Sequence, residues 1–212
     1  IISVHISKFK QKTFVVFFLH YQPERTTVPD GGLFGIQINA LLALRAGLSE
    51  KISILVKEHP STFRNRCDPL ARDPYFYRQI DSIEGVEWVD ISTDNFELID
   101  NAMLTATITG TVALESLIRG TPAVMFGSSF LGESEGLYTY ENNSGFQRFL
   151  NDVSAGKFSP SQVSESISEL VMLDQKWVFH CESGSYQKKK RTALLMLFKA
   201  NVSSIYLDNS AA

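Results

Sequence analysis

Polar side chains follow three apolar stretches of this sequence, each at the point where a buried strand is expected to end. They belong to the segments "HYQPE", "VKEHP" and "TGTVALES", and the candidates are His20, Gln22, Glu24, Lys57, Glu58, His59, Pro60, Thr109, Gly110, Thr111 and Glu115. Ligands of open parallel sheets bind beyond the carboxyl ends of the strands. The three segments therefore predict one shared site, although each could also do no more than cap the helix behind it.

The segment "TITGTVALES" predicts an anion-binding turn. With Thr111 at the start of a helix, the turn Thr109–Thr111 presents amides and hydroxyls at the positive helix end, where a phosphate is stabilised. Gly110 lets the backbone come close to such a ligand. Glu115 lies one helical turn after Thr111 on the same face, so it could accept hydrogen bonds from a ribose. A plain capped helix is the alternative.

The segment "VKEHP" places an imidazole directly after a strand. Pro60 favours an extended backbone at His59, which could then point its ring at a phosphate or at a leaving group. Lys57 and Glu58 could also contact the ligand. Alternatively, these two charges could simply neutralise each other, as exposed pairs often do.

The loop that begins "HYQPE" carries His20 and Gln22 as binding candidates and Glu24 as a catalytic candidate. Glu24 is the carboxylate close behind the end of the first strand. It could hold a sugar hydroxyl, act as a general base, or pair with Arg25 or Arg64. His59 is the second residue with a predicted catalytic role, because an imidazole can assist a leaving group.

Short apolar runs bounded by turn residues predict five strands, and the segments between them predict helices. The strands are 13–19, 52–56, 86–89, 103–108 and 123–126, and the helices are 35–46, 75–82, 96–101 and 112–119. The segment "DNFE", residues 94–97, is a predicted capping box. Regular alternation of strand and helix indicates an α/β fold, a Rossmann-like parallel sheet with helices on both faces.

The last third of the chain gives a weaker pattern. After Gly127 the sequence is rich in Gly, Ser, Glu and Asn and predicts a long loop. Helices are expected again at 146–154, 161–172 and 188–202, packed at the side of the sheet. We therefore expect residues 1–212 to form a single domain. The start "IISVHISKFK" has neither an initiator Met nor a signal-peptide layout, so we expect a piece of a longer protein.

Composition argues against several classes of function. The net charge of −3, with scattered Lys and Arg, offers no basic stripe for nucleic acid. Cys67 and Cys181 lack the spacing of a zinc site or a disulfide framework, which fits a reducing, cytoplasmic setting. No glycine-rich phosphate loop or acidic metal motif is present, so we expect neither a metal nor a cofactor. No apolar run approaches the ~20 residues that cross a bilayer.

Together, "HYQPE", "VKEHP" and "TGTVALESLIRGTPAVMFG" resemble the C-terminal, nucleotide-sugar-binding half of bacterial capsular-polysaccharide glycosyltransferases of the GT-B architecture. The segments are also similar to those of the transferases that use CMP-linked Kdo or sialic acid. The resemblance spans residues 13–127. It implies that His59, Pro60, Thr109 and Thr111 hold the nucleotide and its phosphate. A likeness to nucleotide-sugar epimerases implies that Glu115 binds the ribose.

The resemblance also implies partners. These are a CMP- or UDP-linked sugar donor, a glycan or glycolipid acceptor, and an N-terminal Rossmann-like domain that we expect to be missing from this chain. The chain alone is then expected to be nearly inactive, and to work in the cytoplasm, with peripheral association at the inner face of the bacterial membrane left open. Three alternatives stay open: a nucleotide-sugar epimerase, a transferase of CDP-linked polyol phosphates, and a non-catalytic interaction module.

Overall fold

Parallel strands form the centre of the molecule. The computed structural model describes residues 3–4, 6–9, 13–22, 30–64, 72–128, 131, 134–159, 161 and 163. Within them, one seven-stranded parallel sheet has the order β1-β4-β3-β2-β5-β6-β7. The strands are β1 (Ser3–Val4), β2 (Phe14–Phe18), β3 (Ser53–Lys57), β4 (Val86–Val89), β5 (Leu104–Thr107), β6 (Ala123–Met125) and β7 (Leu137–Thr139). The predicted α/β class is confirmed.

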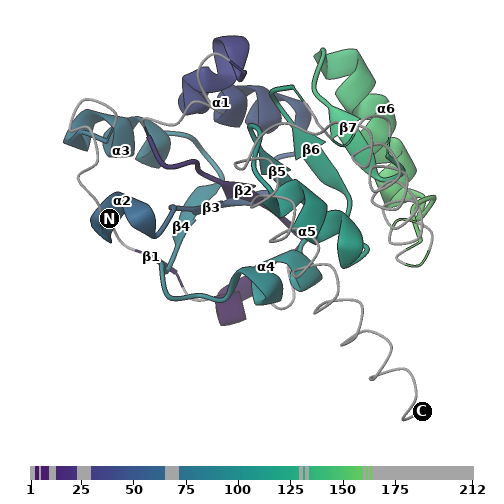
Figure 1. Cartoon of the computed structure of the whole chain (residues 1–212), viewed down its shortest axis with the longest axis horizontal. Helices are drawn as coiled ribbons and strands as arrows, with labels where there is room; N and C mark the ends of the chain where they lie inside the picture. Colours follow the sequence, from purple (N-terminus) through teal and green to yellow (C-terminus); the bar gives the residue numbers. More distant parts are fainter. Residues whose placement is uncertain are drawn as a thin grey trace, which may run out of the picture.

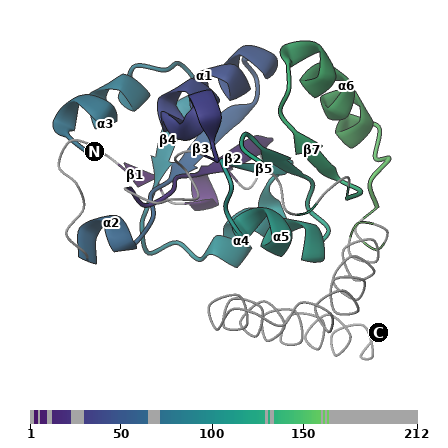
Figure 2. The ribbon, with the colours of Figure 1, turned by 45° about the horizontal axis from the view of Figure 1, so that its top comes forward.

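Helices cover both faces of this sheet, as Figures 1 and 2 show. One face carries α1 (Gln37–Gly47), α3 (Pro74–Asp81) and α6 (Asn143–Ser154). The other carries α4 (Asn95–Asn101) and α5 (Val112–Ile118). A short helix, α2 (Ser61–Arg64), follows β3, and two 3₁₀ turns, η1 (Ile6–Phe9) and η2 (Gly32–Gly35), precede β2 and α1.

The central strand β2 is buried on both faces. Its residues alternate between two apolar clusters: Val15 and Phe17 pack toward α1 and α6, whereas Val16 and Phe18 pack toward α4 and α5. This alternation follows from the pleat of a strand, and two covered faces explain why the sequence of β2 is continuously apolar. The same alternation sends neighbouring side chains at a strand end to opposite faces of the sheet.

The side of the sheet on which successive strands are added changes at β2. From β2 the chain continues to β3 and β4 on one side, and then crosses to β5, β6 and β7 on the other side. The loops behind β2 and β5 therefore diverge at the carboxyl edge of the sheet. In doubly wound folds, such a switch point is where a ligand binds.

The five predicted strands are confirmed, and the predicted helices 35–46, 75–82, 96–101, 112–119 and 146–154 correspond to α1, α3, α4, α5 and α6. The predicted loop after Gly127 is wrong at β7, which is a half-buried edge strand. β7 is held by backbone bonds such as Tyr140 N–H to Met125 O, 2.7 Å, which an apolar pattern does not encode. β1, α2 and the 3₁₀ turns were not predicted either. The predicted helices 161–172 and 188–202 lie outside the described residues, apart from residues 161 and 163.

Helices α1 and α6 approach each other closely at Gly47. A Cβ atom at this position would lie 2.3 Å from Cδ1 of Phe146, which is a fully buried ring. The side-chain amide of Gln147 also donates to the carbonyl of Gly47. The contact therefore depends on the absence of a side chain at Gly47.

We predict that Gly47→Ala lowers the free energy of unfolding by about 1 to 3 kcal/mol, because the added methyl group overpacks the α1–α6 contact. Urea unfolding measures the change. Adding Phe146→Leu makes room for the methyl group, so the double variant should be more stable than the sum of the two single changes predicts. An unchanged midpoint for Gly47→Ala would contradict the packing described here.

Candidate functional site

A pocket of about 280 Å³ opens at the carboxyl edge, on the face that carries α4 and α5. It lies at the β2–β5 switch point. Its lining residues are Phe18, Leu19, His20, Lys57, Glu58, His59, Pro60, Asn95, Thr107, Thr109, Gly110, Thr111, Val112 and Glu115. Three predicted segments thus meet at one site, although the binding role of each residue stays a prediction. Gln22 does not line this pocket, and Glu24 lies outside the described residues.

His20 holds the turn behind β5 in place. Its own backbone is fixed by Gln37, whose side chain accepts from the His20 N–H at 2.7 Å and donates to the His20 carbonyl at 3.1 Å. The Thr109 N–H donates to Nε2 of His20 at 3.2 Å, and the hydroxyl of Thr107 lies 3.0 Å from the same atom. Since Nε2 accepts, the proton of the neutral ring is on Nδ1. His20 therefore positions this turn, and its predicted binding of the nucleotide stays a prediction.

Gly110 is needed because this turn is crowded. A Cβ atom there would lie 2.7 Å from the hydroxyl oxygen of Thr107 and 3.2 Å from Nε2 of His20. The amides of Gly110 and Thr111 have no acceptor among the described residues. Both amides lie at the pocket and can donate to a ligand.

Lys57 stabilises the loop between β4 and α4. Its Nζ donates to the carbonyls of Asp90 at 2.9 Å, Ile91 at 2.7 Å and Thr93 at 2.8 Å. Burial lowers the pKa of the ammonium, and the charges of Asp90 and Asp94 oppose this shift. Only the protonated form supplies three donors, so these bonds use all of them. Lys57 thus holds this loop in place, and its predicted contact with a ligand stays a prediction.

Glu58 points to the opposite face and pairs with Arg72, not with Lys57. The Arg72 Nε donates to the Glu58 carboxylate at 2.9 Å, and the two side chains are 3% and 6% exposed. The carboxylate also accepts from the Tyr77 hydroxyl at 3.1 Å and from the His59 N–H at 2.8 Å. These protein donors, with Thr62, satisfy both oxygens, so Glu58 positions His59. Its predicted contact with a ligand stays a prediction.

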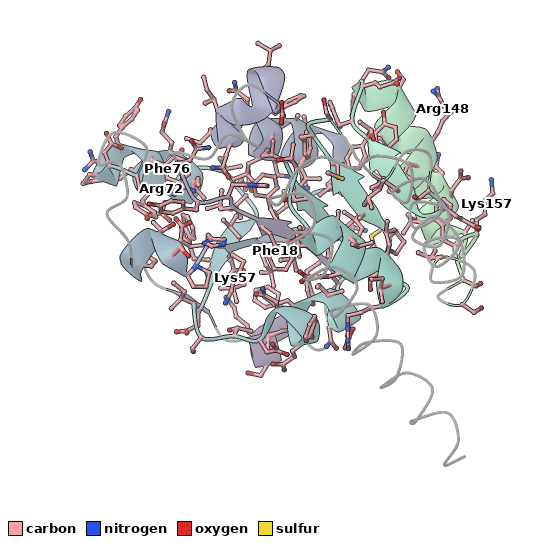
Figure 3. All side chains as sticks on the ribbon, in the orientation of Figure 1. Phe18, Lys57, Arg72, Phe76, Arg148 and Lys157 are labelled. Carbon is pink, nitrogen blue, oxygen red and sulfur yellow. The ribbon has the colours of Figure 1, made fainter. Side chains whose placement is uncertain are left out.

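Arg72 joins this carboxylate to the end of β2. Its guanidinium also donates to the His20 carbonyl and lies 4.4 Å above the ring of Phe76. Figure 3 shows Arg72 beside Phe76. Both histidine-bearing loops are therefore connected through one buried guanidinium. Arg72 was not identified from the sequence, because it lies far along the chain from both strand ends.

His59 is exposed at the pocket. The Ser61 N–H donates to its Nδ1 at 3.2 Å, so a neutral ring carries its proton on Nε2. The ring of Tyr21 lies 6.3 Å away, centre to centre. The local turn thus selects the tautomer in which Nε2 is a hydrogen-bond donor, the form suited to contact an anionic oxygen.

Glu115 is half-buried at the pocket wall. Burial raises the pKa of its carboxyl group, and a hydrogen bond from the Thr111 side chain opposes the shift. The predicted shared face of Thr111 and Glu115 is confirmed by this contact. A carboxylate that is partly desolvated beside free amides can accept hydrogen bonds from ligand hydroxyls.

Two kinds of feature are not found in the described part of the chain. No group of three or more His, Cys, Asp or Glu side chains there is placed to hold a metal ion. No described helix is long and apolar enough to cross a membrane.

No known protein family and no curated protein matches this sequence. Solved structures do match. S. aureus MnaA, in a co-structure with UDP, has a TM-score of 0.50 and 11% identity over 84% of this chain and 49% of its own. Thermosulfurimonas dismutans KpsC, a beta Kdo 2,7 transferase, has a TM-score of 0.47 and 16% identity over 77% of this chain and 54% of its own. The glycosyltransferase SnogD from Streptomyces nogalater has a TM-score of 0.43 and 12% identity, covering 76% of this chain and 40% of its own.

At such identities the likeness to MnaA concerns the fold, and it agrees with the Rossmann-like sheet described above. The chain spans about half the length of the MnaA and KpsC chains that it matches.

We predict that Glu115→Gln makes the protein more stable at pH 7 and leaves its stability near the wild-type value at pH 4. The folded chain raises the pKa of Glu115, so the protonated side chain favours folding. Its contribution is complete below the unfolded pKa, about 4.3, and is lost as the pH rises through the folded value. Urea unfolding from pH 4 to pH 7 measures the difference.

Thr111→Val is the matched comparison, since it removes the hydrogen bond that opposes the shift. It should make the stability of the protein fall more steeply over the same pH range. A Glu115→Gln effect that grows toward acid pH would show that the sign is wrong.

Proposed function

We propose that this chain is the nucleotide-sugar-binding domain of a glycosyltransferase with GT-B architecture that works in surface polysaccharide biosynthesis. One observation carries the proposal: the switch-point pocket combines the amides of Gly110 and Thr111, the exposed imidazole of His59 and the carboxylate of Glu115. Amides and an imidazole donate to phosphate oxygens, whereas a carboxylate accepts from ribose hydroxyls. A nucleoside phosphate is the ligand that needs both.

The chemistry follows from where charge develops. When a sugar leaves its nucleotide, negative charge grows on the departing phosphate. Amides held rigidly by the His20–Thr109 bond, with the His59 N–H, stabilise that charge more than they stabilise the bound donor. Stabilising the departing phosphate is a separate task from activating the acceptor. Glu24, which lies outside the described residues, remains the proposed base or sugar contact.

Two findings support this proposal without deciding its details. The three sequence segments resemble those of glycosyltransferases. MnaA, which has a similar fold, was solved in a co-structure with UDP. Because the chain spans about half of such proteins, transfer to an acceptor is proposed for a protein that includes a second domain. An epimerase or a polyol-phosphate transferase would bind its nucleotide in the same pocket, whereas a non-catalytic module would bind none. Binding of UDP, CMP and CDP, followed by product analysis with a UDP-linked sugar, separates these alternatives.

We predict that His59→Ala and Thr111→Val each weaken binding of UDP or CMP by about 1 to 3 kcal/mol, the cost of losing a hydrogen bond to a charged group. Isothermal titration calorimetry measures the affinities. Thr13→Val is the matched control, because the exposed Thr13 precedes β2 and lies at the opposite edge of the sheet. Equal affinities in all variants would exclude the phosphate site.

We further predict different kinetic effects for the two candidate acids in a protein that contains both domains. Glu115→Gln should raise the donor KM with little change in kcat, because it removes binding that the ground state and the transition state share. Glu24→Gln should lower kcat. Steady-state assays separate the two outcomes, and the reverse pattern would mean that the roles are exchanged.

A further inference from the structure

Arg72 lies where the hydrogen-bond ladder between β2 and β3 ends. In the described part of the chain, the bond from the Leu19 N–H to the Lys57 carbonyl, 2.9 Å, closes this ladder. One residue further along each strand, the guanidinium of Arg72 donates to the His20 carbonyl at 2.5 Å and to the Glu58 carboxylate at 2.9 Å. A side chain from a distant segment therefore continues the pairing of the two strand ends.

Each of these contacts lies directly behind a group at the pocket. Nε2 of His20 accepts from the Thr109 N–H, which fixes the turn behind β5. Glu58 accepts from the N–H of His59, whose imidazole is at the pocket. Arg72 itself does not line the pocket. It is therefore placed to set the position of the turn relative to the imidazole without touching a ligand.

Stability alone does not explain why a buried ion pair is used here. The side chains of Arg72 and Glu58 are 3% and 6% exposed. Desolvation offsets much of the attraction between two buried charges, so apolar side chains of similar size often give equal or greater stability. An apolar pair cannot, however, donate from a planar fork to two acceptors at once. The alternative role is to anchor α3, because Arg72 precedes its cap, Asp73, and lies over the ring of Phe76 (Figure 3).

We propose that Arg72 is a positioning residue that fixes the Thr109–Thr111 turn relative to His59, so that ligand affinity depends on a side chain outside the pocket. For its ligand the inference rests on the proposed function, whereas the positioning concerns the protein alone. With the guanidinium in place, the donors of the turn and of the imidazole are arranged before a ligand arrives. Without it, part of the binding free energy is spent on restoring that arrangement.

The test separates position from stability and from charge. Arg72→Met leaves the Glu58 carboxylate buried without its cation, so it should lower the urea midpoint of the full chain. Adding Glu58→Gln removes that charge, so the pair is neutral as in the wild type and the midpoint should recover. Isothermal titration calorimetry should nevertheless show that the double variant binds UDP about ten- to hundredfold more weakly, the range known for contacts that orient metal-binding side chains. Affinity that recovers together with the midpoint would overturn the positioning role.

Two comparisons assign the loss to Arg72. Glu58→Gln alone should weaken UDP less than the double variant, because the guanidinium still reaches both strand ends, and equal losses would assign the effect to Glu58. Arg119 and Asp100 are the matched control: Arg119 also donates to a carboxylate and lies 4.7 Å over a ring, that of Phe96, but at the end of α5 away from the pocket. Arg119→Met with Asp100→Asn should leave the affinity for UDP unchanged, and a loss as large as that of the Arg72 variant would contradict the inference.

NMR of the ligand-free protein tests the positioning directly. In the wild type, His20 holds the Thr109 amide and the Ser61 N–H selects one tautomer of His59. At equal urea midpoint, the Arg72→Met, Glu58→Gln variant should exchange the Thr109 amide hydrogen about tenfold faster and show both His59 tautomers in ¹⁵N spectra. Wild-type exchange and a single tautomer would show that the guanidinium only anchors α3.

Arg72→Lys covers the case in which the double variant does not fold. It keeps a charge beside Glu58 but replaces the planar fork by a single nitrogen, so it should also weaken UDP and speed exchange of the Thr109 amide. Wild-type values of both would overturn the inference. If the wild type binds neither UDP nor CMP, the proposed function fails, and the two NMR measurements alone decide the positioning role.

Discussion

Backbone groups just beyond the strand ends lie outside the hydrogen-bond ladder of the sheet, and side chains pair several of them. Gln37 satisfies both the N–H and the carbonyl of His20, and Lys57 satisfies three carbonyls before α4. Glu58 accepts from the His59 N–H. Leaving such groups unpaired would cost more than the bonds contribute. The loops around the pocket are irregular in shape yet rigid, because polar side chains take the place that sheet hydrogen bonds occupy elsewhere.

This requirement explains which features of the site could be predicted from the sequence. Apolar runs identify strands because a doubly covered sheet demands them, and parallel topology brings all carboxyl ends to one edge. The meeting of His20, His59 and Thr109 at one pocket followed from these two facts. What a strand-end side chain does there depends on its partners. Lys57 and Glu58 are adjacent in sequence, yet they bind opposite layers of the molecule.

Other features were hidden because their causes are distant in sequence. Arg72 comes from the segment before α3, and nothing near it indicates contact with the end of β2. Asn95 lines the pocket, whereas the segment "DNFE" predicts only a helix cap, in which Asp94 accepts from the Glu97 N–H. β7 is stabilised by pairing with β6 and has no apolar pattern of its own. Local pattern predicts an element when burial determines its sequence, and fails when backbone pairing or a long-range contact determines it.

The central position of β2 also has a consequence during synthesis of the chain. Its two partners are β3, which ends at Lys57, and β5, which ends at Thr107. A ribosome therefore releases the segment "FVVFF" well before the strand that covers its second edge exists. An uncharged, aromatic and β-branched segment with an unpaired edge is prone to join other chains. Until β5 has emerged and paired with β2, we expect nascent chains of this protein to be more prone to aggregate than the complete chain.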